Sequence, residues 1–178
     1  EPSTSVGLHA EAGSYGTMGI GANANLAAKG MRNRISTDYF QTDGAVANSN
    51  FGRNRVFYQG RYADDYTRIN WFAGYSGQRY GANTFYSAKF PNQWEEGQRY
   101  FAAVSGESVI GKIKLQPSAS FMRNYDHFQL IRHSSTGENY HRTDVSTLRM
   151  SGTGSWLLGK TALGAEIRHE GILSTNLG

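Results

Sequence analysis

The sequence predicts an all-β fold: about nine long antiparallel strands that together form part of the wall of a closed barrel. Three observations predict it. Polar and apolar residues alternate with period two, several alternating segments run for about 11 to 15 residues against a mode of about five or six in soluble domains, and short and long connections alternate between them. The composition, with 22 Gly, 11 Tyr and only 3 Pro, suits strands and tight turns better than helices.

Period two is clearest in three segments. In Thr17–Ala28 glycines and asparagines alternate with apolar residues, and in 112–125 Lys, Gln and Ser alternate with Ile, Leu and Phe. In Val145–Leu158 one face is polar and the other holds Leu148, Met150 and Trp156. A helix would instead bring residues three and four apart onto one face. In chain order, we expect strands at about 4–14, 17–28, 32–42, 53–63, 67–79, 97–105, 110–125, 143–157 and 160–173.

The connections sort by length. After a short first hairpin at Ser14–Gly16, short and long connections alternate strictly. Outer-membrane barrels have this sidedness, with tight periplasmic turns and extended extracellular loops, so odd-numbered strands are expected to run outward. The short connections are Lys29–Met31, Asp64–Tyr66, Gly106–Val109 and Leu158–Gly159, and the long ones are Asp43–Gly52, Tyr80–Glu96 and Asn124–Arg142.

The apolar face contains many small residues, which a packed core would avoid because it needs large side chains at native density. A surface in contact with lipid has no such need. We therefore expect a transmembrane β-barrel segment whose apolar face contacts lipid and whose polar face lines an aqueous interior. The small residues are Ala10, Ala12, Ala22, Ala24, Ala73, Ala102 and Ala165.

Charge and composition exclude several classes. The net charge is +4, but the basic residues are scattered rather than gathered on one stripe, so nucleic acid is not an expected partner. There is no cysteine, which excludes disulfides and thiolate metal sites. No apolar run is long enough for a membrane-spanning helix, and the first residues do not form a signal peptide.

Nine strands is an odd number, whereas single-chain bacterial barrels have even counts. An open barrel also leaves two unpaired edges that lipid cannot satisfy. We therefore expect residues 1–178 to be part of a larger barrel domain. Two alternatives stay open: a soluble β-sandwich or barrel that binds carbohydrate through its aromatic residues, and a small complete membrane barrel that acts as a surface enzyme or adhesin.

Two stretches carry a resemblance to a known family. YGANTFYSAKFPNQWEE at Tyr80–Glu96 resembles a loop of TonB-dependent receptors of Bacteroidota, and GKTALGAEIRHEGILSTNLG at Gly159–Gly178 is similar to a strand and loop of the same receptors. The opening Gly7–Gly13, followed by Ser14–Gly16 and another strand, is similar to the first barrel hairpin of vitamin B12 transporters.

The resemblance implies active uptake across the outer membrane of a Gram-negative bacterium. Such receptors close roughly 22 strands around an N-terminal plug, and they import a scarce large nutrient by coupling to the TonB complex. The cargo would be a cobalamin, an iron chelate or a glycan, with cobalamin the first candidate. The plug has no counterpart in this chain, so no TonB-contacting residue is assigned. Outer-membrane lipid and a surface lipoprotein over the loops are further expected partners.

The loop Tyr80–Glu96 is the candidate ligand-binding site. Aromatic rings with interspersed amides suit a pocket for a large amphipathic ligand, because stacking supplies contact area and amides supply orientation. The alternative is that these rings pack the loop on itself or on the rim of the barrel. The candidate residues are Tyr80, Asn83, Phe85, Tyr86, Lys89, Phe90 and Trp94.

The strands carry two further sets of side chains with expected positions. Aromatic residues on the lipid side are expected to lie near the membrane interfaces, and charged residues on the other side are expected to line the interior. The aromatic set is Tyr58, Tyr62, Trp71, Tyr75, Tyr100 and Trp156, and the charged set is Asp38, Arg55, Arg61, Arg99, Arg149, Glu166 and Arg168.

No metal, cofactor or catalytic residue is predicted. His127, His133 and His141 have spacings that match no known metal site. Asp43 stands where cobalamin receptors carry calcium-binding loops, but it is the only carboxylate in Asp43–Gly52, so calcium is not expected. No nucleophile elbow, phosphate loop or dinucleotide-binding fingerprint is present, so an enzyme is not expected.

Overall fold

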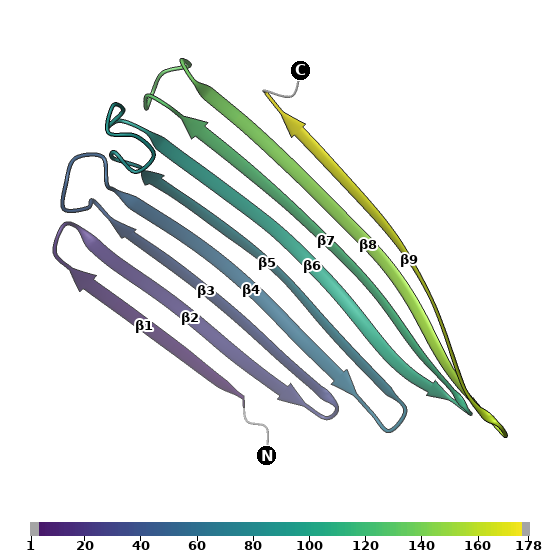
Figure 1. Ribbon diagram of the computed structural model, residues 1–178. Coiled ribbons are helices and arrows are strands. Elements are labelled where there is room, and N and C mark those ends of the chain that lie inside the picture. Colours follow the sequence, from purple (N-terminus) through teal and green to yellow (C-terminus); the bar gives the residue numbers. More distant parts are fainter. Residues whose placement is uncertain (1–3, 176–178) are drawn as a thin grey trace.

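The computed structural model describes residues 4–175 as one antiparallel sheet of nine strands in sequence order (Figure 1). The predicted fold class and strand number are confirmed. The strands are β1 (Ser5–Gly13), β2 (Thr17–Ala28), β3 (Met31–Thr42), β4 (Phe51–Ala63), β5 (Thr67–Gly81), β6 (Trp94–Ile110), β7 (Ile113–Gln129), β8 (Glu138–Trp156) and β9 (Gly159–Ser174).

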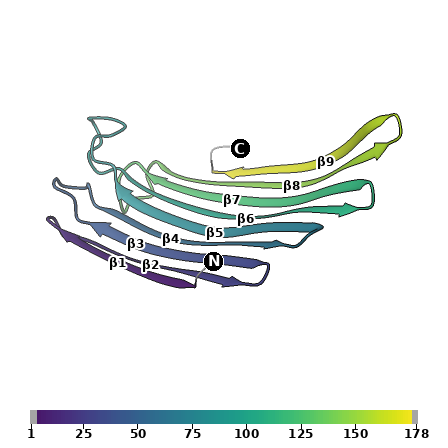
Figure 2. The same cartoon turned by 90° about the horizontal axis from the view of Figure 1, so that it is seen from below.

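The sheet is a single curved layer (Figure 2), and the long loops lie at one end of the strands while the short turns lie at the other (Figure 1). The first hairpin belongs to the loop end but is tight. Tyr15 and Gly16 both have positive φ, 58° and 63°, as a two-residue type I′ turn requires. Among the described residues, no helix has the length and hydropathy to cross a membrane.

The register divides the side chains between two faces. On the apolar face Leu8 is opposite Ala22 at one edge of the sheet, and Met150 is opposite Ala165 at the other. On the polar face Asp38 is opposite Arg55 and Arg149 is opposite Glu166. The expected charged residues all fall on the polar face, and the six expected aromatic residues all fall on the apolar face.

The sheet has almost no hydrophobic core. Within residues 4–175, Ala82 is the only buried hydrophobic residue. On β8 Leu148, Met150 and Trp156 are 58%, 51% and 61% exposed, so the apolar row is not covered by another part of the described chain. The apolar face must therefore be covered by something outside these residues, because exposed patches of this extent are rare on soluble monomers.

The apolar face ends obliquely toward the loop end. On β3 it becomes polar at Gln41, whereas on β8 it becomes polar at Asp144, a residue that the ladder aligns with Thr37 of β3. The border therefore moves toward the turn end by about one residue for each strand crossed. A flat membrane surface cuts strands at this offset when they are tilted by about 35–45°, spaced about 4.8 Å apart and rise about 3.3 Å per residue.

β6 exceeds its predicted length more than any other described strand, since it spans Trp94–Ile110 where 97–105 was expected. The predicted short connection at Gly106–Val109 is wrong, because β6 continues to Ile110 and the turn lies at Gly111, where φ is +61°. Pro117 of β7 lies opposite Gly106, and the ladder is interrupted there because proline has no N–H to donate. A Cβ at position 106 would lie 3.3 Å from Pro117 Cγ, so glycine gives the ring room.

The loops are correspondingly shorter than predicted. β7 extends to Gln129 and β8 begins at Glu138, so only 130–137 of the predicted connection Asn124–Arg142 lies outside the strands. Tyr80 ends up inside β5 and Trp94 begins β6, which leaves 82–93 as the loop between them. Polar residues in these strand ends had indicated loops, but here they continue the ladder.

Candidate functional site

An arc of aromatic rings follows the polar face at the loop end of the sheet. Neighbouring ring centroids are 6.0 Å apart for Phe40 and Phe51, 6.5 Å for Phe51 and Tyr80, and 5.9 Å for Tyr86 and Phe128. The rings come from β3, β4, β5, the loop 82–93 and β7. We call these five residues the aromatic arc. Tilted ring pairs link Phe40, Phe51 and Tyr80, and an edge-to-face pair links Tyr86 and Phe128.

Glu95 joins the two tyrosines of the arc. The hydroxyl groups of Tyr80 and Tyr86 each donate a hydrogen bond of 2.6 Å to Glu95 Oε2. Phe85 stands edge-on to Tyr86, with centroids 4.8 Å apart, and is 78% exposed. The Glu95 carboxylate of β6 thus holds the loop 82–93 through Tyr86, and the exposed ring of Phe85 lies beside that contact.

The pKa of Tyr86 is raised, first because its hydroxyl donates to Glu95 and second because it is partly buried. The folded state therefore holds this proton more tightly than the unfolded state does. The resulting stabilisation is fully present below the ordinary tyrosine pKa of about 10 and is lost as pH rises through the raised value. The loop contact is consequently insensitive to pH in the neutral range.

Glu95→Gln is expected to bring the pKa of Tyr86 back toward its ordinary value, since a neutral amide no longer favours the protonated hydroxyl. The measurement is the tyrosinate absorbance titration of the protein minus that of Tyr86→Phe, repeated in the Glu95→Gln background. Glu96→Gln is the control, because Glu96 faces the opposite side of β6. An identical midpoint in the two backgrounds would contradict the hydrogen bond.

Charged groups lie next along the polar face, toward the turn end. Asp38 accepts from Arg55 Nε at 2.5 Å and from Arg53 Nη2 at 2.9 Å. The Arg53 guanidinium also lies 5.7 Å from the ring centroid of Phe40, which joins the ion pair to the aromatic arc. Further along, Phe57, Phe72 and Phe101 contact one another, with centroids 6.0 to 6.3 Å apart.

Three loops hold each other in place above the arc. Asn48 Nδ2 donates to the carbonyl oxygens of Pro91 and Gln93 at 2.9 and 2.7 Å. Arg132 Nη1 donates to Asn50 Oδ1 at 2.8 Å, and the Arg132 backbone N–H donates to the carbonyl oxygen of Asn92. Loop 82–93 is therefore tied to loops 43–50 and 130–137.

The structure brings together some of the predicted site residues and separates others. Tyr80, Tyr86 and Phe85 lie together on the polar face. Asn83 Nδ2 donates to the Ala47 carbonyl oxygen at 2.7 Å, so its amide holds the loop. Lys89 is exposed and Phe90 is half-buried.

Trp94 is the clearest departure from the predicted site. It lies on the apolar face, edge-on to His127 with centroids 5.3 Å apart, and the Arg132 guanidinium is 6.0 Å from its ring. The reason is the register: Trp94 is opposite Gly81, and Glu95 takes the polar-face position beside Tyr80. Period two along β6 was sufficient to find this, once β6 is known to begin at residue 94.

Phe40, Phe51 and Phe128 were missed as site residues, as was Glu95. All four lie on the polar face at the loop end of their strands. The three phenylalanines are aromatic residues at positions where the alternation predicts a polar side chain. That mismatch was the available signal. Arg132 had no such signal, because its role depends on contacts between loops that are far apart in sequence.

The three histidines are not brought together. His127 faces the apolar side, where its ring stacks on Tyr140 at 4.1 Å, and His141 is on the polar side of β8. His133 lies in the loop 130–137 with φ 66°. Within residues 4–175 no group of three His, Asp or Glu side chains is positioned to hold a metal ion.

Solved structures contain the same sheet. The siderophore receptor PiuA from Acinetobacter baumannii aligns over 98% of this chain and 31% of its own, with a TM-score of 0.72 at 11% sequence identity. The sheet has the fold of part of a TonB-dependent receptor barrel. The ferric citrate transporter FecA in its unliganded form aligns over 96% and 29%, with a TM-score of 0.61 at 13% identity. The copper transporter OprC aligns over 99% of this chain and 31% of its own, with a TM-score of 0.57 at 16% sequence identity.

This chain thus spans about 30% of each solved structure. The similarity establishes its fold, that of a barrel segment. No family model and no curated protein matches the sequence. The resemblance to Bacteroidota receptors, and to cobalamin transporters among them, stays a prediction.

Proposed function

We propose that this chain is part of the barrel wall of an outer-membrane transporter, with lipid against its apolar face and water inside its polar face. The uncovered apolar face carries the proposal. A soluble sandwich would bury that face under a second sheet, whereas residues 4–175 form one sheet only. Hydrocarbon would remove the apolar side chains from water at a gain of about 25 cal/mol per Å². The oblique border of the face supports tilted strands in a bilayer.

The remaining barrel strands, by this proposal, pair with β1 and β9, each of which pairs with a single neighbour among the described residues. Lipid cannot satisfy the backbone groups of an open edge. We further propose that a plug domain, which couples transport to the TonB complex, is contributed by another part of the same protein. A surface lipoprotein over the loops would complete the assembly.

The cargo that fits the site best is a large metal-chelate nutrient, a class that includes cobalamin and ferric siderophores. Phe85 and the arc tyrosine Tyr86 supply exposed ring surface, at 78% and 52% exposure, and Lys89 is an exposed cation of the same loop. Tyr80 and Asn83 position the loop. The structural neighbours are a siderophore receptor, a ferric citrate transporter and a copper transporter. This similarity supports iron chelates, which were already among the expected cargoes, as candidates equal to cobalamin.

Uptake by cells tests the function. The full-length protein should import one of three labelled probes, namely cobalamin, ferric citrate or a ferric hydroxamate, and import should stop in cells without TonB. Phe85→Ala and Tyr86→Ala should each reduce binding of that probe by about 3- to 10-fold, the worth of one ring contact.

Tyr66→Ala is the matched control. Tyr66 is 71% exposed but belongs to a short turn at the opposite end of the strands, so its loss should leave uptake unchanged. TonB-independent uptake would rule out active transport. Uptake that depends on TonB but ignores both loop substitutions would remove the loop from the binding site.

A further inference from the structure

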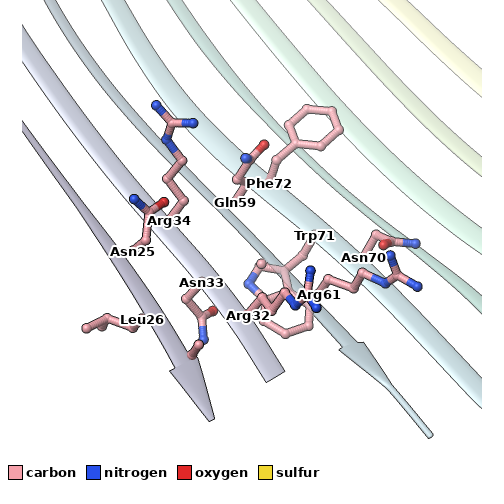
Figure 3. A pocket seen from close by; sticks show the side chains of 12 residues that line it. Asn25, Leu26, Arg32, Asn33, Arg34, Gln59, Arg61, Asn70, Trp71 and Phe72 are labelled. Carbon is pink, nitrogen blue, oxygen red and sulfur yellow. The ribbon is translucent and has the colours of Figure 1, made fainter. Parts of the chain in front are cut away.

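A pocket lies on the polar face near the turn end, separate from the aromatic arc. It has a volume of about 460 Å³ and is lined from β2, β3, β4 and β5. Figure 3 shows its side chains on these four neighbouring strands. Three of the lining residues are the arginines Arg32, Arg34 and Arg61, and three amides, Asn25, Gln59 and Asn70, lie on the same face. A fourth amide, Asn33, also lines the pocket, but it lies on the apolar face, where its side-chain oxygen accepts from the Tyr58 hydroxyl.

The pocket has cations and no anion. None of its lining residues is Asp or Glu, and none of its three arginines forms an ion pair with another described residue. The carboxylate of β3 on this face, Asp38, is taken by Arg53 and Arg55. Among the described residues no ion-pair partner occupies the guanidinium groups of the pocket, so their hydrogen-bond donors are available to a ligand.

The register makes this arrangement unfavourable on its own. Arg32 and Arg61 are directly opposite each other on β3 and β4, and like charges at directly opposite positions destabilise a sheet. Arg34 follows on the same face two residues later, opposite Gln59. An anion between the guanidinium groups would relieve the repulsion, since arginine binds carboxylate and phosphate groups through paired N–H donors.

We propose that Arg32, Arg34 and Arg61 form a binding site for a small dissolved polyanion, a molecule with two or more carboxylate or phosphate groups. The volume is that of a small-molecule site, the amides can donate to further oxygen atoms, and the Phe72 ring at the edge of the pocket covers an apolar part of the ligand. The inference deepens the proposed function, on which it rests for the claim that the ligand reaches this face from the barrel interior.

The test is equilibrium binding of citrate and of inorganic pyrophosphate to the purified full-length protein at constant ionic strength. The native protein should bind at least one probe, and Arg32→Gln and Arg61→Gln should each weaken that binding by about 10-fold or more. Arg149→Gln is the matched control. It lies in the same row of the polar face and removes the same charge, but its guanidinium is already paired with Glu166.

Thermal stability gives a second, independent measurement. In low salt without a probe, Arg61→Gln should unfold at a higher temperature than the native protein because the like-charge pair is gone. The bound probe should raise the unfolding temperature of the native protein and not that of the variant. Lower stability of Arg61→Gln in low salt would contradict the repulsion on which the site is argued.

Equal loss of binding in Arg149→Gln, or no loss in Arg32→Gln and Arg61→Gln, would overturn the site. An acidic peptide that binds through these arginines while citrate and pyrophosphate do not would overturn the small-molecule occupant. Probe binding that persists in a protein without TonB-dependent uptake would refute the transport function and leave the anion site standing. TonB-dependent uptake without probe binding would refute the anion site and leave the transport function standing.

Discussion

Met150→Arg destabilises the protein in a bilayer by about 2–4 kcal/mol, whereas Ser151→Arg changes its stability by less than about 1 kcal/mol. The two residues are neighbours on β8. Met150 lies on the apolar face between Pro117 and Ala165, and Ser151 lies on the polar face between Gln116 and Gly164. By the proposed function, arginine at position 150 must leave water near the middle of the membrane, while arginine at position 151 stays in water.

The measurement is a urea titration of the full-length protein folding into phospholipid vesicles, followed by tryptophan fluorescence. Neither position introduces arginine directly opposite a charged side chain, so the pair isolates the effect of the face. If both substitutions are harmless, the apolar face does not contact hydrocarbon. If both are equally harmful, the two faces share one environment, and the proposed barrel wall is wrong.

Asn48→Ala accelerates hydrogen exchange in the loop 82–93 by about 10- to 100-fold, equivalent to about 1.4–2.8 kcal/mol of local stability. The substitution removes both hydrogen bonds to the carbonyl oxygens of Pro91 and Gln93. It also puts alanine at a backbone φ of 53°, where asparagine is better tolerated. The amide of Ala82, which donates to Gln93, reports the change directly.

Asn48→Gly separates the two causes, because glycine accepts the positive φ and loses only the side-chain amide. We expect it to exchange faster than the native protein and more slowly than Asn48→Ala. Lys89→Ala, an exposed residue of the same loop, should change little. Unchanged exchange at Ala82 in Asn48→Ala would mean that the loop is held by other contacts.

Period two predicted the strands and faces because each strand satisfies the same local rule over many residues. Leu148 and Met150 lie on one side of β8 because they are two residues apart, whatever contacts that side. Strand ends were less predictable. Gly106 and the polar residues 138–142 suggest turns by composition, yet Gly106 stays paired with β5 and residues 138–142 stay paired with β7. The hydrogen bonds that extend a strand are made with the adjacent strand, and the local sequence of one segment does not show that partner.

The candidate site was predictable only where local pattern and tertiary contacts agree. Tyr80 and Tyr86 attracted notice as aromatic residues near a loop, and the shared contact with Glu95 joins them. Trp94 attracted notice for the same reason but faces the other side, because the register of β6 with β5 decides its direction. Arg132 contacts residues more than 80 positions earlier in the chain, a pairing that no local pattern contains.

The ties among loops 43–50, 82–93 and 130–137 determine what an outside molecule can recognise on this rim. Because Asn48, Asn92 and Arg132 contribute to one surface from three separate stretches, an antibody or phage that binds it would read a discontinuous epitope. A synthetic peptide copied from any one stretch would lack the other two, and serum raised against it would recognise the denatured chain better than the folded protein.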